Sequence, residues 1–179
     1  MKRPDGVDKN WIFSDQADES VSALLGKVPG RWGRMTPLCR LLIVQSAQLL
    51  QDRGLLESGH RFSDSGRRVG LIGGTKRGSL HTDLAFVDSM VEGLASPALF
   101  GYTLPNIPLA ETAVAFGLTG PVFAVFENKI PLKKAELEAR RFLESDRTLE
   151  FMLACDFDHY HTVDGQEEIS VNLTVVERI

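Results

Sequence analysis

Apolar and polar positions alternate most regularly in the middle of the chain, between residues 68 and 128. A short apolar run at residues 69–72 is followed by a Gly-rich turn, and a second apolar run at 122–126 ends this segment. Two stretches between the runs, 79–90 and 108–117, repeat apolar residues at helical spacing. Strands that alternate with helices in this way are typical of a layered α/β domain with a parallel sheet.

The two flanks of this segment extend the same layered pattern. Helical spacing predicts helices at residues 15–26, 36–54 and 131–146. Apolar runs predict further strands at residues 11–13, 148–155 and 169–177. Together with the two central runs, these strands predict an α/β fold with a mixed five-stranded sheet and helices packed on it.

The composition narrows the class of protein. Of the 179 residues, 43% are hydrophobic and 25% are charged, so we expect a single globular domain over residues 1–179. The net charge of −4, with scattered Lys and Arg, disfavours nucleic-acid binding. No apolar run approaches the roughly 20 residues that cross a membrane, and the amino terminus lacks an apolar signal sequence, so we expect no membrane association and a cytoplasmic protein. Cys39 and Cys155 lie among apolar residues and are expected to be buried and unreactive.

A series of short motifs follows the order found in a known family. The motifs are Gly74-Thr75, Gly78-Ser79, Ser96-Pro97, Pro105-Asn106 and Gly117-Leu118-x-Gly120-Pro121. In this order they resemble the amino-terminal half of the β-ketoacyl synthases, the condensing enzymes of fatty-acid and polyketide synthesis. The resemblance implies half of a thiolase-like fold.

The same resemblance implies that the catalytic residues of the family are missing. In the family, a nucleophilic cysteine follows the strand that comes after the Gly-Pro motif. Counting from Gly120, the expected nucleophile position holds Lys129. The histidines that assist condensation belong to the carboxy-terminal half of the family fold and are not expected in this chain. We therefore expect no catalytic residue, no cofactor, and a non-catalytic protein of fatty-acid or polyketide-type biosynthesis.

The resemblance also implies a protein partner. In the family, the loop that corresponds to residues 95–106 crosses a dimer interface, and the strand after the Gly-Pro motif pairs across the dimer axis. The matching interface candidates are Phe100, Tyr102, Leu104, Val122, Phe123, Val125 and Phe126. They predict a homodimer, or a heterodimer with a condensing-enzyme subunit.

Two other functions are compatible with the sequence. An acyl-thioester transferase or hydrolase would use Lys129 as its nucleophile, with the turn at residues 73–79 supporting the thioester. The alternative for Lys129 is a charged surface group. A module that binds an acyl carrier protein would instead use cations to meet an acidic helix. Its candidate residues are Arg31, Arg34, Lys76 and Arg77.

A run near the carboxyl end contains four residues that can bind divalent metals. They are Asp156, Asp158, His159 and His161. The transferase or hydrolase hypothesis could use this cluster as its catalytic group in place of Lys129. Alternate residues of a strand face opposite sides, so a strand here would separate the two aspartates from the two histidines. We therefore expect no metal site in this run.

Overall fold

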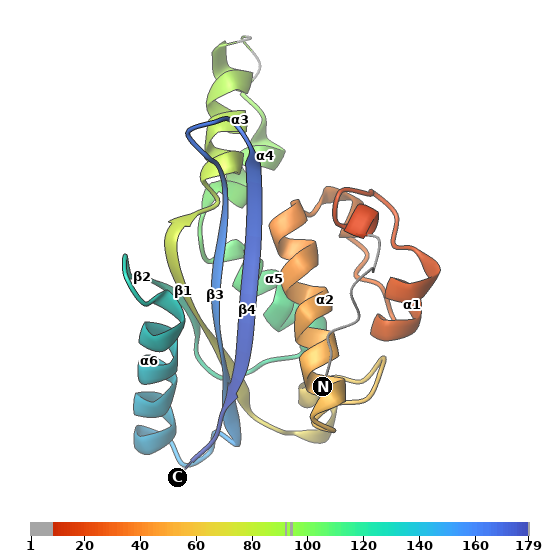
Figure 1. Cartoon of the computed structure of the whole chain (residues 1–179). Helices are drawn as coiled ribbons and strands as arrows, with labels where there is room; N and C mark the ends of the chain where they lie inside the picture. Colours follow the sequence, from red (N-terminus) through yellow and green to blue (C-terminus); the bar gives the residue numbers. More distant parts are fainter. Residues whose placement is uncertain (1–8, 92, 94, 179) are drawn as a thin grey trace.

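The computed structural model describes residues 9–178 except Glu92 and Leu94, and it contains a four-stranded mixed sheet in the order β2-β1-β3-β4 (Figure 1). The strands are β1 (Val69–Gly78), β2 (Val122–Phe126), β3 (Phe151–His161) and β4 (Glu167–Val176). Strand β1 pairs in parallel with β2 and β3, whereas β4 is antiparallel to β3. The predicted α/β class is therefore confirmed.

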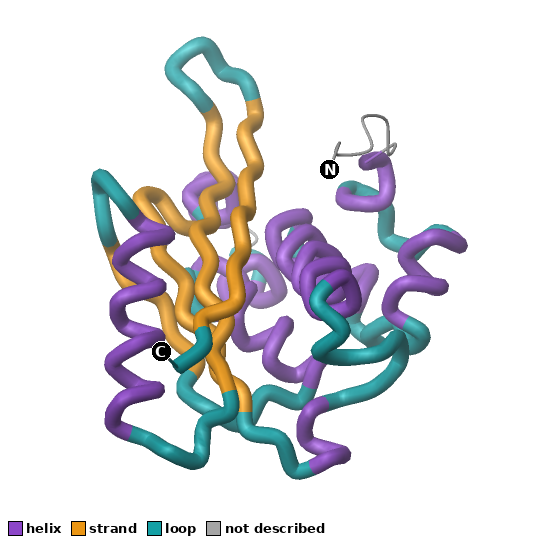
Figure 2. Tube along the Cα trace, turned by 60° about the horizontal axis from the view of Figure 1, so that its bottom comes forward, coloured by secondary structure: helices purple, strands orange, loops and turns teal. Residues whose placement is uncertain are grey.

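Helices cover both faces of this sheet (Figure 2). The α-helices are α1 (Glu19–Leu25), α2 (Pro37–Asp52), α3 (Leu80–Val91), α4 (Pro97–Thr103), α5 (Ile107–Phe116) and α6 (Pro131–Ser145). Three short 3-10 helices are η1 (Lys9–Ile12), η2 (Trp32–Arg34) and η3 (Phe62–Ser65). No helix in the described part of the chain is long and apolar enough to cross a membrane.

The apolar residues form one core on each side of the sheet. On one side, α2 and α5 pack on residues that include Leu71, Leu153 and Phe157. On the other side, the narrow apolar stripe of α6 packs on Ile72 and Met152. Both faces of β1 are buried, as expected for the central strand of a parallel sheet.

The sheet has four strands, and the predicted strand at residues 11–13 is wrong. Residues 9–12 form η1, and the carbonyl of Ile12 accepts a hydrogen bond from Nη1 of Arg40 (3.0 Å). Arg40 is itself buried, and its Nε donates to the carbonyl of Trp32 (3.0 Å). The Arg40 side chain of α2 therefore binds the backbone carbonyl of Ile12, which in a sheet would accept a hydrogen bond from a neighbouring strand.

The Gly-rich stretch predicted as a turn is largely a continuation of β1. Gly73 and Gly74 lie within the strand, and their role is to allow close packing. A Cβ on Gly73 would lie 2.4 Å from the ring of Phe157, and one on Gly74 would lie 2.0 Å from the carbonyl oxygen of Pro131. Only Gly78, at the end of the strand, needs a positive φ (60°).

Two other element boundaries also differ from the prediction. The predicted loop at residues 95–106 contains helix α4, which begins with Pro97 and is capped by Ser96, whose hydroxyl accepts from the N–H of Leu99 (3.3 Å). Strand β3 continues beyond the predicted end at residue 155 to His161, because β4 pairs with its whole outer length.

Replacing Gly74 by Ala is expected to lower the free energy of unfolding by about 1–3 kcal/mol, because the new methyl group would overlap the backbone at Pro131. Gly101→Ala in α4 is the matched control, since a Cβ there has no neighbour within 4 Å and alanine favours a helix. Urea unfolding of both variants measures the difference. Equal stabilities would show that α6 does not pack this closely on β1.

Candidate functional site

Lys129 occupies an exposed loop. It lies between β2 and α6, and its backbone N–H donates to Oε1 of Glu127 (2.9 Å). A lysine becomes nucleophilic when its amine is removed from water. The solvent-facing position of Lys129 therefore supports the surface alternative and provides no setting for a nucleophilic amine.

Neither thiol of the chain is placed for nucleophilic chemistry. Cys39 in α2 and Cys155 in β3 are both fully buried. Burial raises the pKa of the Cys39 thiol to about 12 and also raises the pKa of Cys155 well above its usual range. Because the thiolate is the reactive form, both residues behave as small apolar core residues.

The carboxylate of Asp158 binds the end of β1. Its Oδ1 accepts hydrogen bonds from Oγ1 of Thr75 (2.7 Å) and from the N–H groups of Lys76 (3.1 Å), Arg77 (2.6 Å) and Gly78 (2.9 Å). Here the register of β1 against β3 is irregular, which directs successive N–H groups to one point. The donors that the hydrolase hypothesis assigned to a thioester are therefore bound by the protein's own carboxylate.

The four cations considered for carrier binding do not form one patch. Arg31 pairs with the buried carboxylate of Glu111 (3.0 Å), and Arg77 lies over the ring of Tyr160, 4.2 Å from its centre. Figure 1 places the connector that carries Arg31 and Arg34 on the outer side of α2, whereas the end of β1 lies between β2 and β3. No observation on the described residues favours the carrier-binding module.

The structure separates the metal-capable run as its strand pattern predicts. Asp156 bonds to Nδ2 of Asn172 (2.7 Å), and Asp158 bonds to β1. His159 and His161 lie on the opposite face of β3, where they meet a residue that the run does not contain. The ring of His81, at the start of α3, stacks on His159 with the ring centres 4.2 Å apart and the planes inclined by 10°.

A carboxylate completes this histidine cluster. Oε1 of Glu167 in β4 lies 2.8 Å from Nε2 of His159. Burial lowers the pKa of both His159 and His81, in each case against the opposing effect of Glu167. Sequence reasoning missed His81 and Glu167 because the contacts depend on how α3 and the β3–β4 hairpin pack. Only the pairing of His161 with Glu167 across a short hairpin could have indicated from nearby residues that Glu167 joins the cluster.

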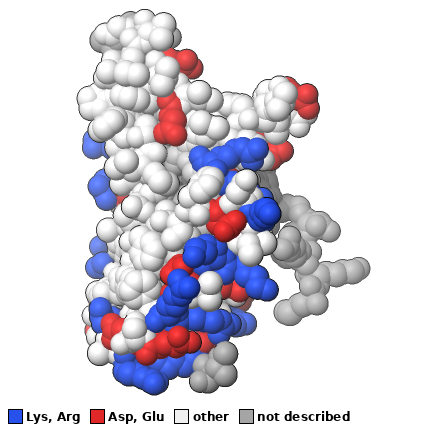
Figure 3. Space-filling model, turned by 90° about the vertical axis from the view of Figure 1, so that its left-hand side faces the viewer, with Lys and Arg blue, Asp and Glu red and all other residues white. Residues whose placement is uncertain are grey.

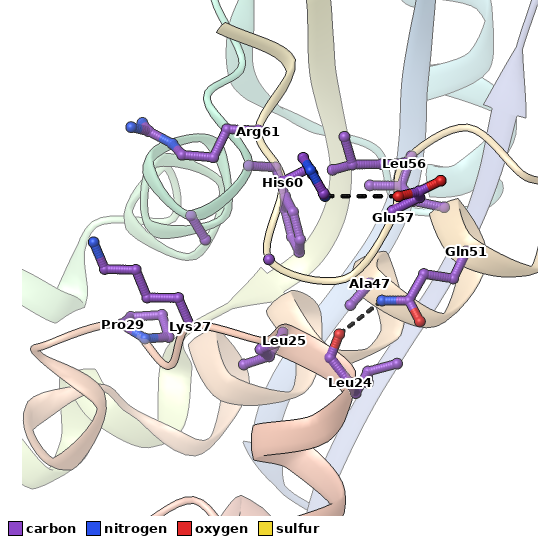
Figure 4. A pocket seen from close by; sticks show the side chains of 14 residues that line it. Leu24, Leu25, Lys27, Pro29, Ala47, Gln51, Leu56, Glu57, His60 and Arg61 are labelled. Atoms are coloured by element: carbon purple, nitrogen blue, oxygen red, sulfur yellow. Dashed lines mark hydrogen bonds and ion pairs between the residues drawn. The ribbon is translucent and has the colours of Figure 1, made fainter. Parts of the chain in front are cut away.

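Two hollows differ in what they can hold. A groove of about 460 Å³ lies between α4 and the ends of β1 and β2, with Pro105, Val125 and Phe126 among its lining residues. Figure 4 shows a smaller cavity, of about 60 Å³, where Leu25 and His60 are among the lining side chains. The smaller cavity has room for roughly two water molecules and is too small for an acyl chain.

The interface candidates divide into exposed and packed residues. Phe126 is 73% exposed, Phe100 58% and Leu104 55%. Tyr102 instead packs against the core and its hydroxyl donates to Oε1 of Glu111 (3.2 Å), while Phe123 packs on α6. The other two candidates, Val122 and Val125, are partly buried.

Helix α3 contacts α4 and carries further exposed apolar residues, and we group these with the exposed candidates as one apolar surface. We define this surface by Leu84, Val87, Met90, Phe100, Leu104 and Phe126. Figure 3 shows that the upper part of this side of the molecule, where α3 and α4 lie, is mostly uncharged, with a few acidic side chains. Lys, Arg, Asp and Glu crowd the lower part, around α6.

Strand β2 is an edge of the sheet, with backbone groups that face away from β1. The N–H of Glu127 donates to the carbonyl of Thr75 (2.9 Å), so the backbone groups of Glu127 face β1. Because the direction alternates along a strand, the backbone groups of every second residue of β2 face away from β1. These outward residues are Val122, Ala124 and Phe126. Oδ1 of Asn106 accepts from the N–H of Ala124 (2.7 Å). The outward groups of Val122 and Phe126 have no strand partner within the described residues.

Comparisons with known proteins agree with this architecture. The sequence matches the family model described as "Beta-ketoacyl synthase, N-terminal domain" over residues 3–126. "The ishigamide ketosynthase/chain length factor" is similar in structure, with a TM-score of 0.68 and 19% identity, over 88% of this chain and 47% of that chain. This chain thus spans about half the length of that protein. No match was found among curated protein sequences.

Two other solved structures share the fold. "Ketosynthase (ApeO) in Complex with its Chain Length Factor (ApeC) from Xenorhabdus doucetiae" has a TM-score of 0.62 at 13% identity, over 95% of this chain and 71% of that chain. "A Beta-ketoacyl synthase from Burkholderia phymatum STM815" has a TM-score of 0.55 at 17% identity, over 82% of this chain and 34% of that chain. At these identities the likeness concerns the fold, and it confirms the predicted thiolase-like half.

The burial of both cysteines predicts that neither reacts in the folded protein. With Ellman's reagent at pH 8, we expect close to no reactive thiol in buffer and two per chain in guanidinium chloride. A thiol that reacts rapidly in buffer would contradict the burial described here and would make that cysteine a candidate nucleophile. Cys39→Ala and Cys155→Ala variants would then identify which residue reacts.

Proposed function

Because the chain belongs to the β-ketoacyl synthase N-terminal domain family, we propose that it is a non-catalytic, ketosynthase-like subunit of fatty-acid or polyketide-type biosynthesis. In this proposal it acts by association with a second thiolase-like chain, either another copy of itself or a condensing-enzyme subunit. The partner supplies the nucleophile and the acyl tunnel.

The first support is the lack of a nucleophile in the expected place. Lys129 is exposed there, and the two cysteines are buried, which raises the pKa of both thiols. The donors at the end of β1 that would suit a carbonyl oxygen are occupied by Asp158. Condensation at this site would need both a reactive thiolate and vacant donors.

The observation that carries the association is the edge strand β2 beside the apolar surface. An unpaired strand edge binds a second strand through its backbone groups, and a neighbouring apolar surface supplies the larger part of the binding free energy. Phe126 lies where the two features meet, with its backbone at the sheet edge and its ring exposed beside the groove. Aromatic residues in such positions commonly dominate binding.

The nature of the partner is suggested by the similar structures. Two of them are described as a ketosynthase together with a chain length factor. A chain of this fold that lacks a nucleophile corresponds to the non-condensing member of such a pair. The proposed partner is therefore a condensing subunit, with self-association as the simpler form of the same interface.

Phe126→Asp is expected to weaken this association by more than about tenfold, because it places a charge at the centre of a desolvated contact. Light scattering on the purified chain reports self-association as a mass above the 19.8 kDa of one chain. Co-expression with a tagged ketosynthase of the same genome, followed by quantitative co-purification, reports the heterodimer.

Phe13→Asp is the matched control. Phe13 is 56% exposed, close to Phe126 in side-chain type, but it follows η1 at the other end of the described chain. The proposal requires that Phe126→Asp reduces association and Phe13→Asp does not. A monomer that also fails to bind the ketosynthase would overturn it, as would an equal loss in both variants.

A further inference from the structure

Three of the four histidines of the chain lie together, at a position that the proposed association does not use. His81 is at the start of α3, whereas His159 and His161 share one face of β3. The ring of His81 lies between the other two, with its centre 4.2 Å from that of His159 and 4.7 Å from that of His161. Glu167 of β4 pairs with His161 in the hairpin and so faces the same cluster.

Two ring nitrogens of this cluster lack hydrogen-bond partners among the described residues. Nδ1 of His81 and Nδ1 of His159 are both buried and have no hydrogen-bond partner among the described residues. His159 is fully buried. Buried polar atoms are nearly always paired, so the two unpaired imidazole nitrogens of these stacked rings indicate a missing interaction. Burial also favours the neutral rings, in which one nitrogen keeps a lone pair.

Three residues of the cluster are close enough to share one ion. Each of His81, His161 and Glu167 offers a ligand atom, and these atoms all lie within 4.8 Å of one another. Ligands around a tetrahedral zinc ion, at about 2.0–2.2 Å from the metal, are roughly 3.4 Å apart. His161 and Glu167 have exposed side chains, so small rotations can close the remaining gap.

We propose that His81, His161 and Glu167 bind one divalent transition-metal ion of the zinc type, with a fourth position open to water. Two imidazoles and one carboxylate suit zinc, whereas magnesium and calcium prefer oxygen ligands alone. His159 acts as a positioning residue, because its Nε2 lies 2.8 Å from Oε1 of Glu167 and can orient that carboxylate. The ion would link the start of α3 to the β3–β4 hairpin.

The test is zinc binding by the full, untagged chain after removal of metal with a chelator. Titration against a chromophoric zinc chelator should give one ion per chain. His161→Ala should weaken zinc binding by more than about tenfold, and so should Glu167→Gln, which keeps the shape of the side chain. Cobalt should give the visible absorption of a nitrogen- and oxygen-ligated site in the wild-type chain, and this absorption should be lost in both variants.

His60→Ala is the matched control, because His60 is the fourth histidine and lies in an exposed loop outside the cluster. It should bind zinc with unchanged affinity. Circular dichroism checks that His161→Ala and Glu167→Gln remain folded, as expected for exposed residues. A wild-type chain that binds no zinc at micromolar concentration would overturn the proposal. So would folded cluster variants that bind as tightly as the wild-type chain, or a His60→Ala chain that loses affinity equally.

Discussion

The close approach of helices to β1 sets the spacing of the layers. Gly73 leaves room for the ring of Phe157 on one face, and Gly74 lets the first turn of α6 contact the strand backbone on the other. Because these positions carry no side chain, α5 and α6 can both pack directly against the central strand. Both helices also contact β2, whose pairing with β1 determines which of its backbone groups face outward. The strand edge is therefore a consequence of pairing and packing along β1.

The end of β1 is held by hydrogen bonds to a charged group rather than by close packing. Three successive N–H groups and one hydroxyl converge on Asp158, an arrangement that elsewhere binds anions from solution. Here the anion is part of the chain, so the direction in which β1 leads into α3 is fixed without a ligand. Asp158 thus holds the segment that leads into α3, whose first turn carries His81. His81 stacks on His159, the residue that follows Asp158 in β3. The contact of Asp158 with the end of β1 therefore both stabilises the fold and positions the histidine cluster.

The sequence was sufficient for the elements that depend on local pattern. The apolar spacing of α2, α5 and α6 predicted these helices within a few residues, and the motif order predicted the thiolase-like half. Predictions failed where a distant residue decides the structure. Residues 11–13 look like a strand, but Arg40 binds the carbonyl of Ile12, and Gly73-Gly74 looks like a turn until the packing against Phe157 and Pro131 is known.

The candidate site shows the same division. That Asp158 and His159 would face opposite ways followed from strand alternation alone. That His81 and Glu167 would complete the cluster did not, because it depends on a helix and a hairpin that are far from each other in the sequence. Helix α4 is an intermediate case, since Ser96-Pro97 is a recognisable helix start within a stretch whose apolar content suggested an irregular loop.

The hydrogen bond between Asn106 and Ala124 affects how the free chain behaves in solution. Exposed sheet edges tend to join identical edges and to grow into aggregates, and proteins limit this by interrupting the edge. The side-chain amide of Asn106 interrupts the short edge of β2 at its middle residue. A strand of arbitrary sequence cannot pair along the whole edge without first breaking that bond. This hydrogen bond therefore opposes edge-to-edge pairing of free chains and favours partner strands shaped to accommodate Asn106.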